Sequence, residues 1–309
     1  MKYLLLSSNS LSGIGQVMIR YRTLLELQGH SVDMRYYGDA VTRDTYDVGF
    51  AFLLPFVSVL DAADKHMEGC ARKLRMTVCE TEPVHEAYGL FARYPEVLVP
   101  SEFSKRILEK QFPNITFKKL LHYAPIPTKT VVNMGSFYTF YTIGNIADFR
   151  KNIPMLLRAM ERFPNARLVL KATCKQPIKI PGNQILVLNQ FMNDDEMDRL
   201  HDSCHCYVNC SHSEGVGMGA VEAAIRNKPV ILTDYGGCKE YVKTPWIVSC
   251  TPVKVGRDEF LFKKDTMWGL PSFSELITHM QTCYNNNIRH YSHEHTHILM
   301  NTLKNKVLD

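Results

Sequence analysis

The sequence predicts an α/β protein built from two consecutive doubly wound parallel sheets. The chain has 309 residues, and at roughly 150 residues per domain this length suggests about two domains. Short apolar segments alternate with helical patterns, which is typical of parallel sheets covered on both faces. From Pro125 to Gly135 prolines and threonines interrupt the alternation. This stretch is interpreted as the linker between the domains.

The first predicted domain covers residues 1–125 and opens with a strand, a loop and a helix. A turn rich in glycine and serine, at 7–15, leads into a helix over 16–28 that ends at Gly29. Five apolar segments are predicted as strands: 3–6, 31–36, 48–52, 76–79 and 97–99.

The second predicted domain covers residues 136–287 and repeats this alternation. Its strands are expected at 138–143, 167–171, 185–188, 206–210 and 229–232, and its helices at 153–163, 194–202 and 219–226. Ligands of such sheets bind outside the carboxyl ends of the strands. A cleft between the two domains is therefore the expected site.

Composition and charge narrow the class of protein. The hydrophobic share of 45% and the charged share of 22% are those of an ordinary globular chain, and the net charge of +5 permits anionic small ligands without indicating nucleic acid. Nine cysteines, with only four apolar residues between Met1-Lys2 and Ser7, favour reduced thiols over a secreted disulfide framework. The apolar window Val48–Leu60 is too short to span a bilayer and predicts buried core. A cytoplasmic location is expected.

The most informative segment runs from Ser211 to Ala223. Its glycines at 215, 217 and 219 follow a predicted strand and open a predicted helix, so backbone N–H groups and the helix dipole can receive phosphate oxygens. Glu214 and Glu222 flank the glycines, and a carboxylate is a natural acceptor for sugar hydroxyls. Without this context, Glu214 and Glu222 would be interpreted as an acid at a helix start and a surface glutamate.

The pair Glu214 and Glu222, with seven residues between them in Ser-Glu-Gly-Val-Gly-Met-Gly-Ala-Val-Glu-Ala, resembles the E-x7-E signature of retaining GT-B glycosyltransferases, family 4 in particular. Three further segments resemble that family in the same order: 99–105, 143–152 and 234–242. The resemblance covers about residues 1–280. It implies a GT-B architecture, with two Rossmann-like domains facing a central cleft, and a last helix at about 288–309 that packs back on the first domain.

The resemblance also implies roles for individual residues. Glu214 would contact the donor sugar near its reacting carbon, and Glu222 would bind the ribose hydroxyls. Lys151, with Arg150 and Lys171, would neutralise the diphosphate, because the leaving group gains negative charge. Asn145 stands where an arginine is common in the family, so the choice among these three cations is open. The expected backbone contacts to the donor are Gly215, Val216, Gly217, Met218 and Gly219.

Two features of the first domain are further candidates. The loop with Gly13 and Gly15 resembles the family's first glycine loop, which approaches the donor phosphates or the acceptor. It fails as a dinucleotide fingerprint, because Met18 occupies the third glycine position. His85 follows a segment that in the family faces the donor, and we predict it as a third catalytic candidate after Glu214 and Lys151. A structural role for His85 is equally compatible with the sequence.

Two clusters of metal-binding residue types are not interpreted as metal sites. The first consists of Cys204, His205, Cys206, Cys210 and His212. It runs along a predicted strand, where neighbours point to opposite faces and cannot converge on zinc. The second consists of His290, His293, His295 and His297, which are expected on the solvated face of a polar C-terminal helix.

The sequence therefore predicts a retaining glycosyltransferase of hexosyltransferase type that uses a GDP- or UDP-linked sugar. It needs no metal or other cofactor, and its acceptor is a glycan, a lipid-linked molecule or another hydroxyl compound. No nucleic acid partner is expected, and peripheral contact with a membrane stays open. The alternatives are a nucleotide-sugar epimerase on the same fold and a noncatalytic sugar-nucleotide binding protein.

Overall fold

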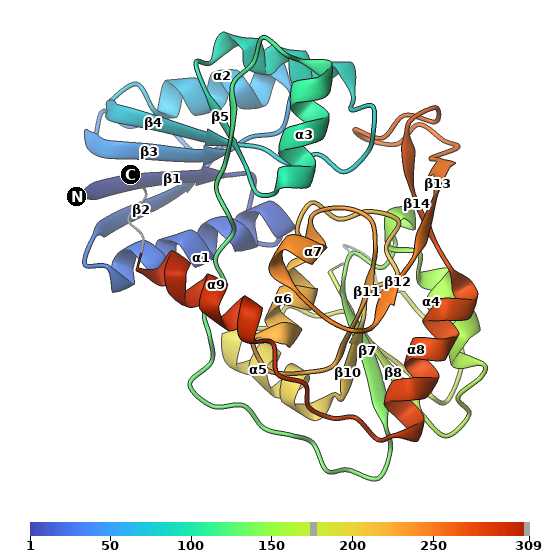
Figure 1. Ribbon diagram of the computed structural model, residues 1–309. Helices are drawn as coiled ribbons and strands as arrows, with labels where there is room; N and C mark the ends of the chain where they lie inside the picture. Colours follow the sequence, from blue (N-terminus) through green and yellow to red (C-terminus); the bar gives the residue numbers. More distant parts are fainter. Residues whose placement is uncertain (174–177, 306–309) are drawn as a thin grey trace. The chain divides into compact units, whose positions relative to one another are not determined.

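The structure is a computed structural model and describes residues 1–173 and 178–305. The chain forms two compact units (Figure 1). The N-terminal unit contains Met1–Pro125, Val255–Thr266 and the end of the chain from Met300, and the C-terminal unit contains Ile126–Lys254 and Met267–Leu299.

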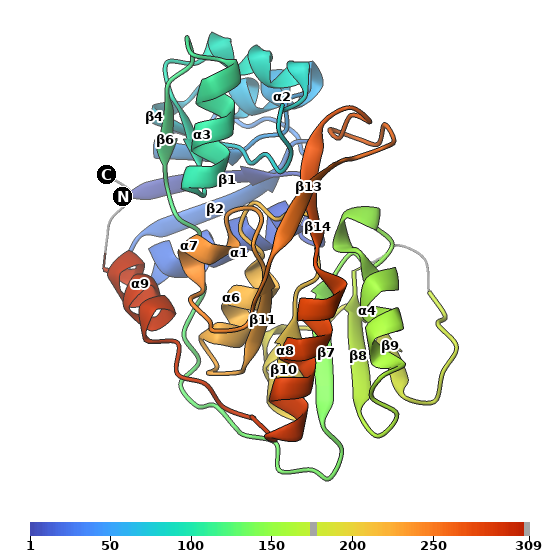
Figure 2. The same cartoon turned by 45° about the vertical axis from the view of Figure 1, so that its right-hand side comes forward.

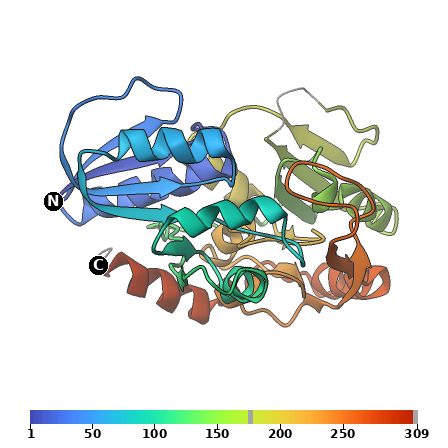
Figure 3. The ribbon, with the colours of Figure 1, turned by 90° about the horizontal axis from the view of Figure 1, so that it is seen from above.

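The N-terminal unit is built on a six-stranded parallel sheet with the order β2-β1-β3-β4-β5-β6. Its strands are β1 (Lys2–Ser7), β2 (Ser31–Tyr36), β3 (Tyr46–Phe52), β4 (Cys70–Met76), β5 (Val97–Val99) and β6 (Phe117–Lys119). Its helical segments are α1 (Gly13–Leu27), α2 (Val57–His66), the short helix η1 (Glu86–Arg93) and α3 (Glu102–Gln111). Figure 3 shows α2 lying over the strands.

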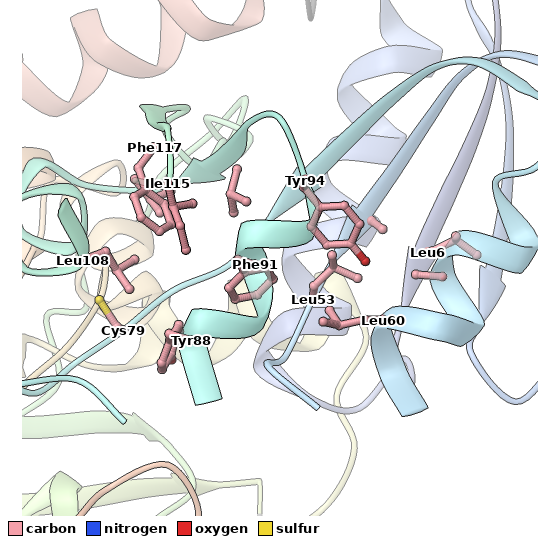
Figure 4. Packing of buried hydrophobic residues seen from close by; sticks show 14 of the residues in the cluster. Leu6, Leu53, Leu60, Cys79, Tyr88, Phe91, Tyr94, Leu108, Ile115 and Phe117 are labelled. Atoms are coloured by element: carbon pink, nitrogen blue, oxygen red, sulfur yellow. The ribbon is translucent and has the colours of Figure 1, made fainter. Parts of the chain in front are cut away.

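Alternation along the strands divides the core of this unit between the two faces of the sheet. On one face Leu6 of β1 belongs to a buried cluster with Leu60 of α2, Phe91 of η1 and residues of α3 (Figure 4). Helix α1 covers the other face, where the rings of Tyr21 and Phe50 meet edge to face at 5.0 Å. Both faces of the sheet are therefore covered, as the continuous apolar strands require.

The C-terminal unit has a second six-stranded parallel sheet, with the order β12-β11-β10-β7-β8-β9. Its strands are β7 (Thr139–Gly144), β8 (Arg167–Ala172), β9 (Ile185–Leu188), β10 (Cys206–Val208), β11 (Val230–Thr233) and β12 (Ile247–Val248). Its helices are η2 (Phe149–Lys151), α4 (Ile153–Met160), α5 (Asp194–Ser203), α6 (Met218–Ala224), α7 (Cys238–Tyr241) and α8 (Phe273–Asn285). The predicted class, two doubly wound parallel sheets, is confirmed.

An antiparallel hairpin of β13 (Cys250–Lys254) and β14 (Met267–Pro271) projects from the C-terminal unit (Figure 2). The segment between its strands belongs to the N-terminal unit. There Leu261 is buried in the same apolar cluster as Leu60, and the ring of Phe260 lies 5.6 Å from that of Phe56. The chain thus leaves the second unit to complete the core of the first.

The last helix, α9 (Glu294–Lys304), begins later than expected, and its histidines are not all solvated. His293 precedes the helix and is 2% exposed, with ring nitrogens bonded to the carbonyl oxygens of Lys228 and Lys243. The expected solvated face was therefore wrong for His293, because two buried carbonyls require partners. Further along, the Ala124 N–H donates to Met300 Sδ. The expected helix end at 306–309 lies outside the described residues.

No helix within residues 1–173 and 178–305 is both long enough and apolar enough to cross a membrane.

Candidate active site

The predicted site residues of the C-terminal unit gather at the carboxyl ends of β7 and β10. These strands pair in parallel, so their ends meet at one edge of the sheet. After β10, the loop from Asn209 to Gly217 carries Glu214, and after β7 the short helix η2 carries Arg150 and Lys151. The topology thus brings together two segments that are more than sixty residues apart in sequence.

Glu214 is buried and has three hydrogen-bonding partners. Lys151 Nζ lies 2.5 Å from Oε1, and the Ser211 hydroxyl donates to the same oxygen at 2.8 Å. Arg150 Nη1 lies 3.0 Å from Oε2. The side chain of Glu214 is only 8% exposed, so these contacts are shielded from water. Both oxygens of the carboxylate are therefore bound by cations.

Burial and charge act in opposite directions on this carboxyl. Burial raises the pKa of Glu214, but the charges of Lys151 and Arg150, with the hydrogen bonds from Lys151 and Ser211, outweigh burial and lower this pKa to about 2. Glu214 is consequently ionised at neutral pH. An ionised carboxylate can accept hydrogen bonds from sugar hydroxyls but has no proton to donate.

Arg150 also holds the loop that carries Glu214. Its Nη1 donates to the carbonyl oxygen of Ser213 at 2.7 Å, and its backbone carbonyl accepts from the N–H of His212 at 2.8 Å. Asp148 faces the same guanidinium at 3.3 Å. Because these contacts engage both the side chain and the main chain of Arg150, its position depends on the loop as much as on any ligand. Lys151 makes its ion pair only through its flexible side chain.

Close packing requires glycine at positions 217 and 219. Gly217 has a φ of +72°, and a Cβ atom there would lie 2.3 Å from Cys238 Sγ. A Cβ atom on Gly219 would lie 2.4 Å from the Tyr207 hydroxyl. Met218 begins α6, one residue before the predicted start, and Val216 is buried beside it. The loop is thereby pressed against α7 and β10.

Ring stacking anchors the same loop to the hairpin. The His212 ring lies flat on Trp268, with ring centroids 4.4 Å apart and planes tilted by 10°. His212 Nδ1 is 2.7 Å from the carbonyl oxygen of Gly269, whose N–H donates to the His212 carbonyl at 3.0 Å. By its place in the sequence, His212 is a candidate only for the discounted zinc cluster. Its observed partners instead make it a structural contact between the loop and β14.

Glu222 lies on α6 and is buried, with 8% of its surface exposed. Its Oε2 faces Nε2 of His201 on α5 at 3.7 Å. Its carbonyl oxygen accepts from Arg226 Nη1 at 2.9 Å. His201 could not be predicted as a site residue from the sequence, because nothing in its own segment distinguishes it from a core histidine.

The third predicted cation lies on the neighbouring strand. Lys171 pairs with Ile143 in the register of β8 and β7 and is buried. Its Nζ donates to the carbonyl oxygen of Ala172 at 2.9 Å. The ammonium of Lys171 is therefore already directed at the end of its own strand.

The predicted residues of the N-terminal unit have local structural partners. The Ser12 hydroxyl caps α1 by accepting from the Gly15 N–H, and a Cβ atom on Gly15 would lie 1.6 Å from the Asn9 carbonyl oxygen. A Cβ atom on Gly13 would meet nothing within 4 Å. His85 caps η1, where its Nδ1 accepts from the Ala87 N–H at 3.0 Å.

The cysteine- and histidine-rich strand is engaged in core contacts. Cys204, Cys206 and Cys210 are buried free thiols, and His205 Nδ1 accepts from the Thr139 N–H at 2.8 Å. Among residues 1–173 and 178–305, no group of three or more His, Cys, Asp or Glu side chains could hold a metal ion.

Comparison with known proteins gives a family match for part of the chain and similar structures for nearly all of it. Residues 136–245 match the model of the family Glycosyl transferases group 1. No curated protein matches the chain. Sucrose-phosphate synthase from Thermosynechococcus elongatus is similar in structure, with 14% identity, a TM-score of 0.71 and coverage of 99% of this chain and 95% of that one.

Two further structures are similar at lower scores. One is the catalytic domain of starch synthase IV from Arabidopsis thaliana bound to ADP and acarbose, with 9% identity, a TM-score of 0.61 and coverage of 99% and 95%. The other is an E. coli structure described as trehalose-6-phosphate bound with UDP-2-fluoro glucose, with 9% identity, a TM-score of 0.56 and coverage of 99% and 100%.

Fold and comparison together define a class: the chain has the GT-B fold of the similar structures, and its C-terminal unit matches a glycosyltransferase family model. More particularly, the residues that match the Glycosyl transferases group 1 model, 136–245, include Arg150, Lys151, Glu214 and Glu222. The predicted fold is confirmed, and the predicted resemblance to glycosyltransferases is confirmed over residues 136–245.

Proposed function

We propose that the protein transfers a hexose-type sugar from a nucleotide-diphosphate sugar, GDP- or UDP-linked, to an acceptor hydroxyl with retention of configuration and without a metal ion. One observation carries the proposal. The buried carboxylate of Glu214 lies between Lys151 and Arg150, next to a glycine loop at the carboxyl ends of β7 and β10. Such a strand end is where this class of sheet receives its ligand.

The charges of the site suit the proposed bond changes. The bond between the sugar's anomeric carbon and the diphosphate oxygen breaks, and the acceptor oxygen forms a new bond to that carbon on the same face. The acceptor's proton passes to a donor phosphate oxygen, so the nucleoside diphosphate leaves with the electrons of the broken bond. The Lys151 ammonium would exchange Glu214 for the diphosphate and stabilise this charge.

The two glutamates would have separate tasks. Glu214, ionised because of its depressed pKa, would accept hydrogen bonds from the donor sugar near the reacting carbon. Glu222 would accept the ribose hydroxyls from its place on α6. Replacing Glu222 with Ala should then weaken donor binding, whereas replacing Glu214 with Ala should lower turnover more than affinity.

The similar structures support a nucleotide-linked donor but not one particular base. One of them is described as bound to ADP and another as bound to UDP-2-fluoro glucose. The acceptor would be a glycan, a lipid-linked molecule or another hydroxyl compound. A lipid-linked acceptor would bring the protein to a membrane surface.

The test is thermal stability of the protein with UDP, GDP, ADP and their common sugar conjugates, each with and without EDTA. A ligand at 100 times its dissociation constant stabilises a protein by about 2.7 kcal/mol. We expect one base to raise the melting temperature of wild type, with EDTA having no effect, and Glu222→Gln to lose most of the increase. A protein stabilised by none of these ligands would overturn the proposal, and a shift abolished by EDTA would overturn its metal independence.

Incubation with the donor then separates the proposed transferase from its alternatives. An epimerase would convert the donor's sugar with no acceptor present. A noncatalytic binding protein would neither transfer nor hydrolyse it. Donor consumption that depends on an added acceptor is the result expected here.

A further inference from the structure

A buried row of three polar side chains ends at Glu222. The Tyr141 hydroxyl, on β7, lies 2.8 Å from Nδ1 of His201 on α5. Nε2 of the same ring lies 3.7 Å from Glu222 Oε2 on α6. Tyr141 is completely buried and His201 is 1% exposed. The row therefore connects the sheet to the carboxylate through the interior of the unit.

The row has a direction when the Tyr141 phenol is the donor in its contact with His201. Burial raises the pKa of Tyr141 well above its ordinary value, so the phenol keeps its proton. When the phenol donates to Nδ1, the ring proton of His201 is on Nε2, the atom that faces Glu222. The 3.7 Å separation between Nε2 and Oε2 exceeds the length of a hydrogen bond. The attraction between this N–H and the carboxylate is therefore electrostatic.

Neighbouring contacts hold Tyr141, His201 and Glu222 next to one another. Arg226 of the segment after α6 pairs with Asp198 on α5 and also donates to the Glu222 carbonyl at 2.9 Å. The Tyr141 ring meets His201 edge to face at 5.4 Å. Arg226 thus ties α5 to the end of α6 next to the contact between His201 and Glu222, and the Tyr141 ring packs against the imidazole from β7.

We infer that His201 is a positioning residue that holds the Glu222 carboxylate in the orientation that receives the ribose of the donor. The inference rests on the proposed function, because it assigns Glu222 to the ribose. A glutamate side chain has three rotatable bonds, and fixing them before binding reduces the entropy lost when the ligand arrives. His201 would not touch the ligand itself.

The ratio of the affinities for a ribonucleotide and for its deoxy form reports on ribose recognition. A residue with only a packing role would not change this ratio. The probes are UDP and GDP, whichever binds wild type, and the 2′-deoxy and 3′-deoxy forms of the same nucleotide, titrated by calorimetry. The proposed function predicts that wild type prefers the ribonucleotide by about tenfold or more, the 1.4 kcal/mol scale of one good hydrogen bond. It also predicts that Glu222→Gln loses most of this preference.

The inference makes a separate prediction for His201. An Asn side chain reaches only the position of Nδ1, whereas a Gln side chain places an amide donor near Nε2. We expect His201→Asn to reduce the ribose preference by about fivefold or more, on the scale of a lost hydrogen bond, with little change in affinity for the deoxy nucleotide. His201→Gln should keep most of the preference. His205→Asn, at a buried histidine of the same unit that contacts Thr139, is the matched control and should keep it fully.

The outcomes distinguish the two claims. If Glu222→Gln loses the preference while His201→Asn keeps it, the positioning role is overturned and the proposed function stands. If wild type binds neither nucleotide, or Glu222→Gln keeps the preference, the ribose role of Glu222 is overturned and the inference falls with it. Tyr141→Phe, which removes only the hydroxyl, provides a second route to the same result should His201→Asn fail to fold.

Discussion

Replacement of Glu214 by Gln should destabilise the protein in a way that depends on pH. The substitution keeps the shape of the side chain but leaves Lys151 and Arg150 without their common counter-charge. A carboxyl whose pKa falls from its ordinary value to about 2 on folding contributes about 3 kcal/mol at neutral pH. Loss of one partner from a buried ion pair typically costs a similar amount, about 3 to 5 kcal/mol.

The sign of the pH dependence follows from the direction of the shift. The folded-state pKa of Glu214 is depressed, so its contribution is complete above about pH 4.5, the ordinary pKa, and is lost as the pH falls toward about 2. Wild type then protonates Glu214 and loses the contribution that the Gln variant never had. The difference in stability between the two proteins should therefore narrow across this range.

The assay is thermal unfolding of wild type and Glu214→Gln at pH 7 and at steps down to pH 3. At about 2 to 4 °C per kcal/mol for a domain of this size, we expect the variant to melt roughly 6 to 12 °C lower at pH 7. Glu161→Gln, at an exposed position that ends α4, should change the melting temperature by little. Equal stability of Glu214→Gln and wild type at pH 7, or a difference that does not change with pH, would refute the reasoning.

Three further substitutions test other parts of the structure. Gly217→Ala should lower stability by about 1 kcal/mol or more, because of its positive φ and the 2.3 Å approach to Cys238, while Gly13→Ala should be neutral or slightly stabilising in thermal unfolding. Lys151→Met should weaken binding of UDP or GDP about tenfold or more in calorimetry, and unchanged affinity would argue against a diphosphate role. Leu261→Ala should destabilise the N-terminal unit by about 2 to 5 kcal/mol, and a loss below 1 kcal/mol would contradict its place in that core.

The fold could be predicted from its apolar strands. Strands that carry polar or exposed residues were misplaced or not predicted. Strand β4 lies at Cys70–Met76, not at 76–79, because Arg72, Lys73 and Arg75 interrupt the apolar pattern. The hairpin of β13 and β14 is half exposed and was not predicted. Apolar periodicity reports burial, so it identifies strands covered on both faces and is weak for strands that water reaches.

The candidate site could be predicted only where its residues are close in sequence. Glu214, Glu222 and the glycines share one segment whose context indicates ligand binding. Ser211 was inside that segment, yet its bond to Glu214 depends on the turn of the loop. His201 and Tyr141 come from α5 and β7, and only the folded sheet brings them to Glu222. Tertiary contacts of this kind leave no local pattern.

The two glutamates are held in different ways, and this difference bears on what each can do in the proposed reaction. Glu214 is neutralised by two cations, so a donor that takes Lys151 must first break a buried ion pair of the resting protein. Glu222 faces Nε2 of the His201 imidazole at 3.7 Å. Because Glu222 would contact the ribose in the proposed function, its loss should act mainly on affinity for the donor. When the diphosphate arrives and takes Lys151, the carboxylate of Glu214 would become available to the sugar. We therefore expect substitution of Glu214 to lower turnover more than affinity.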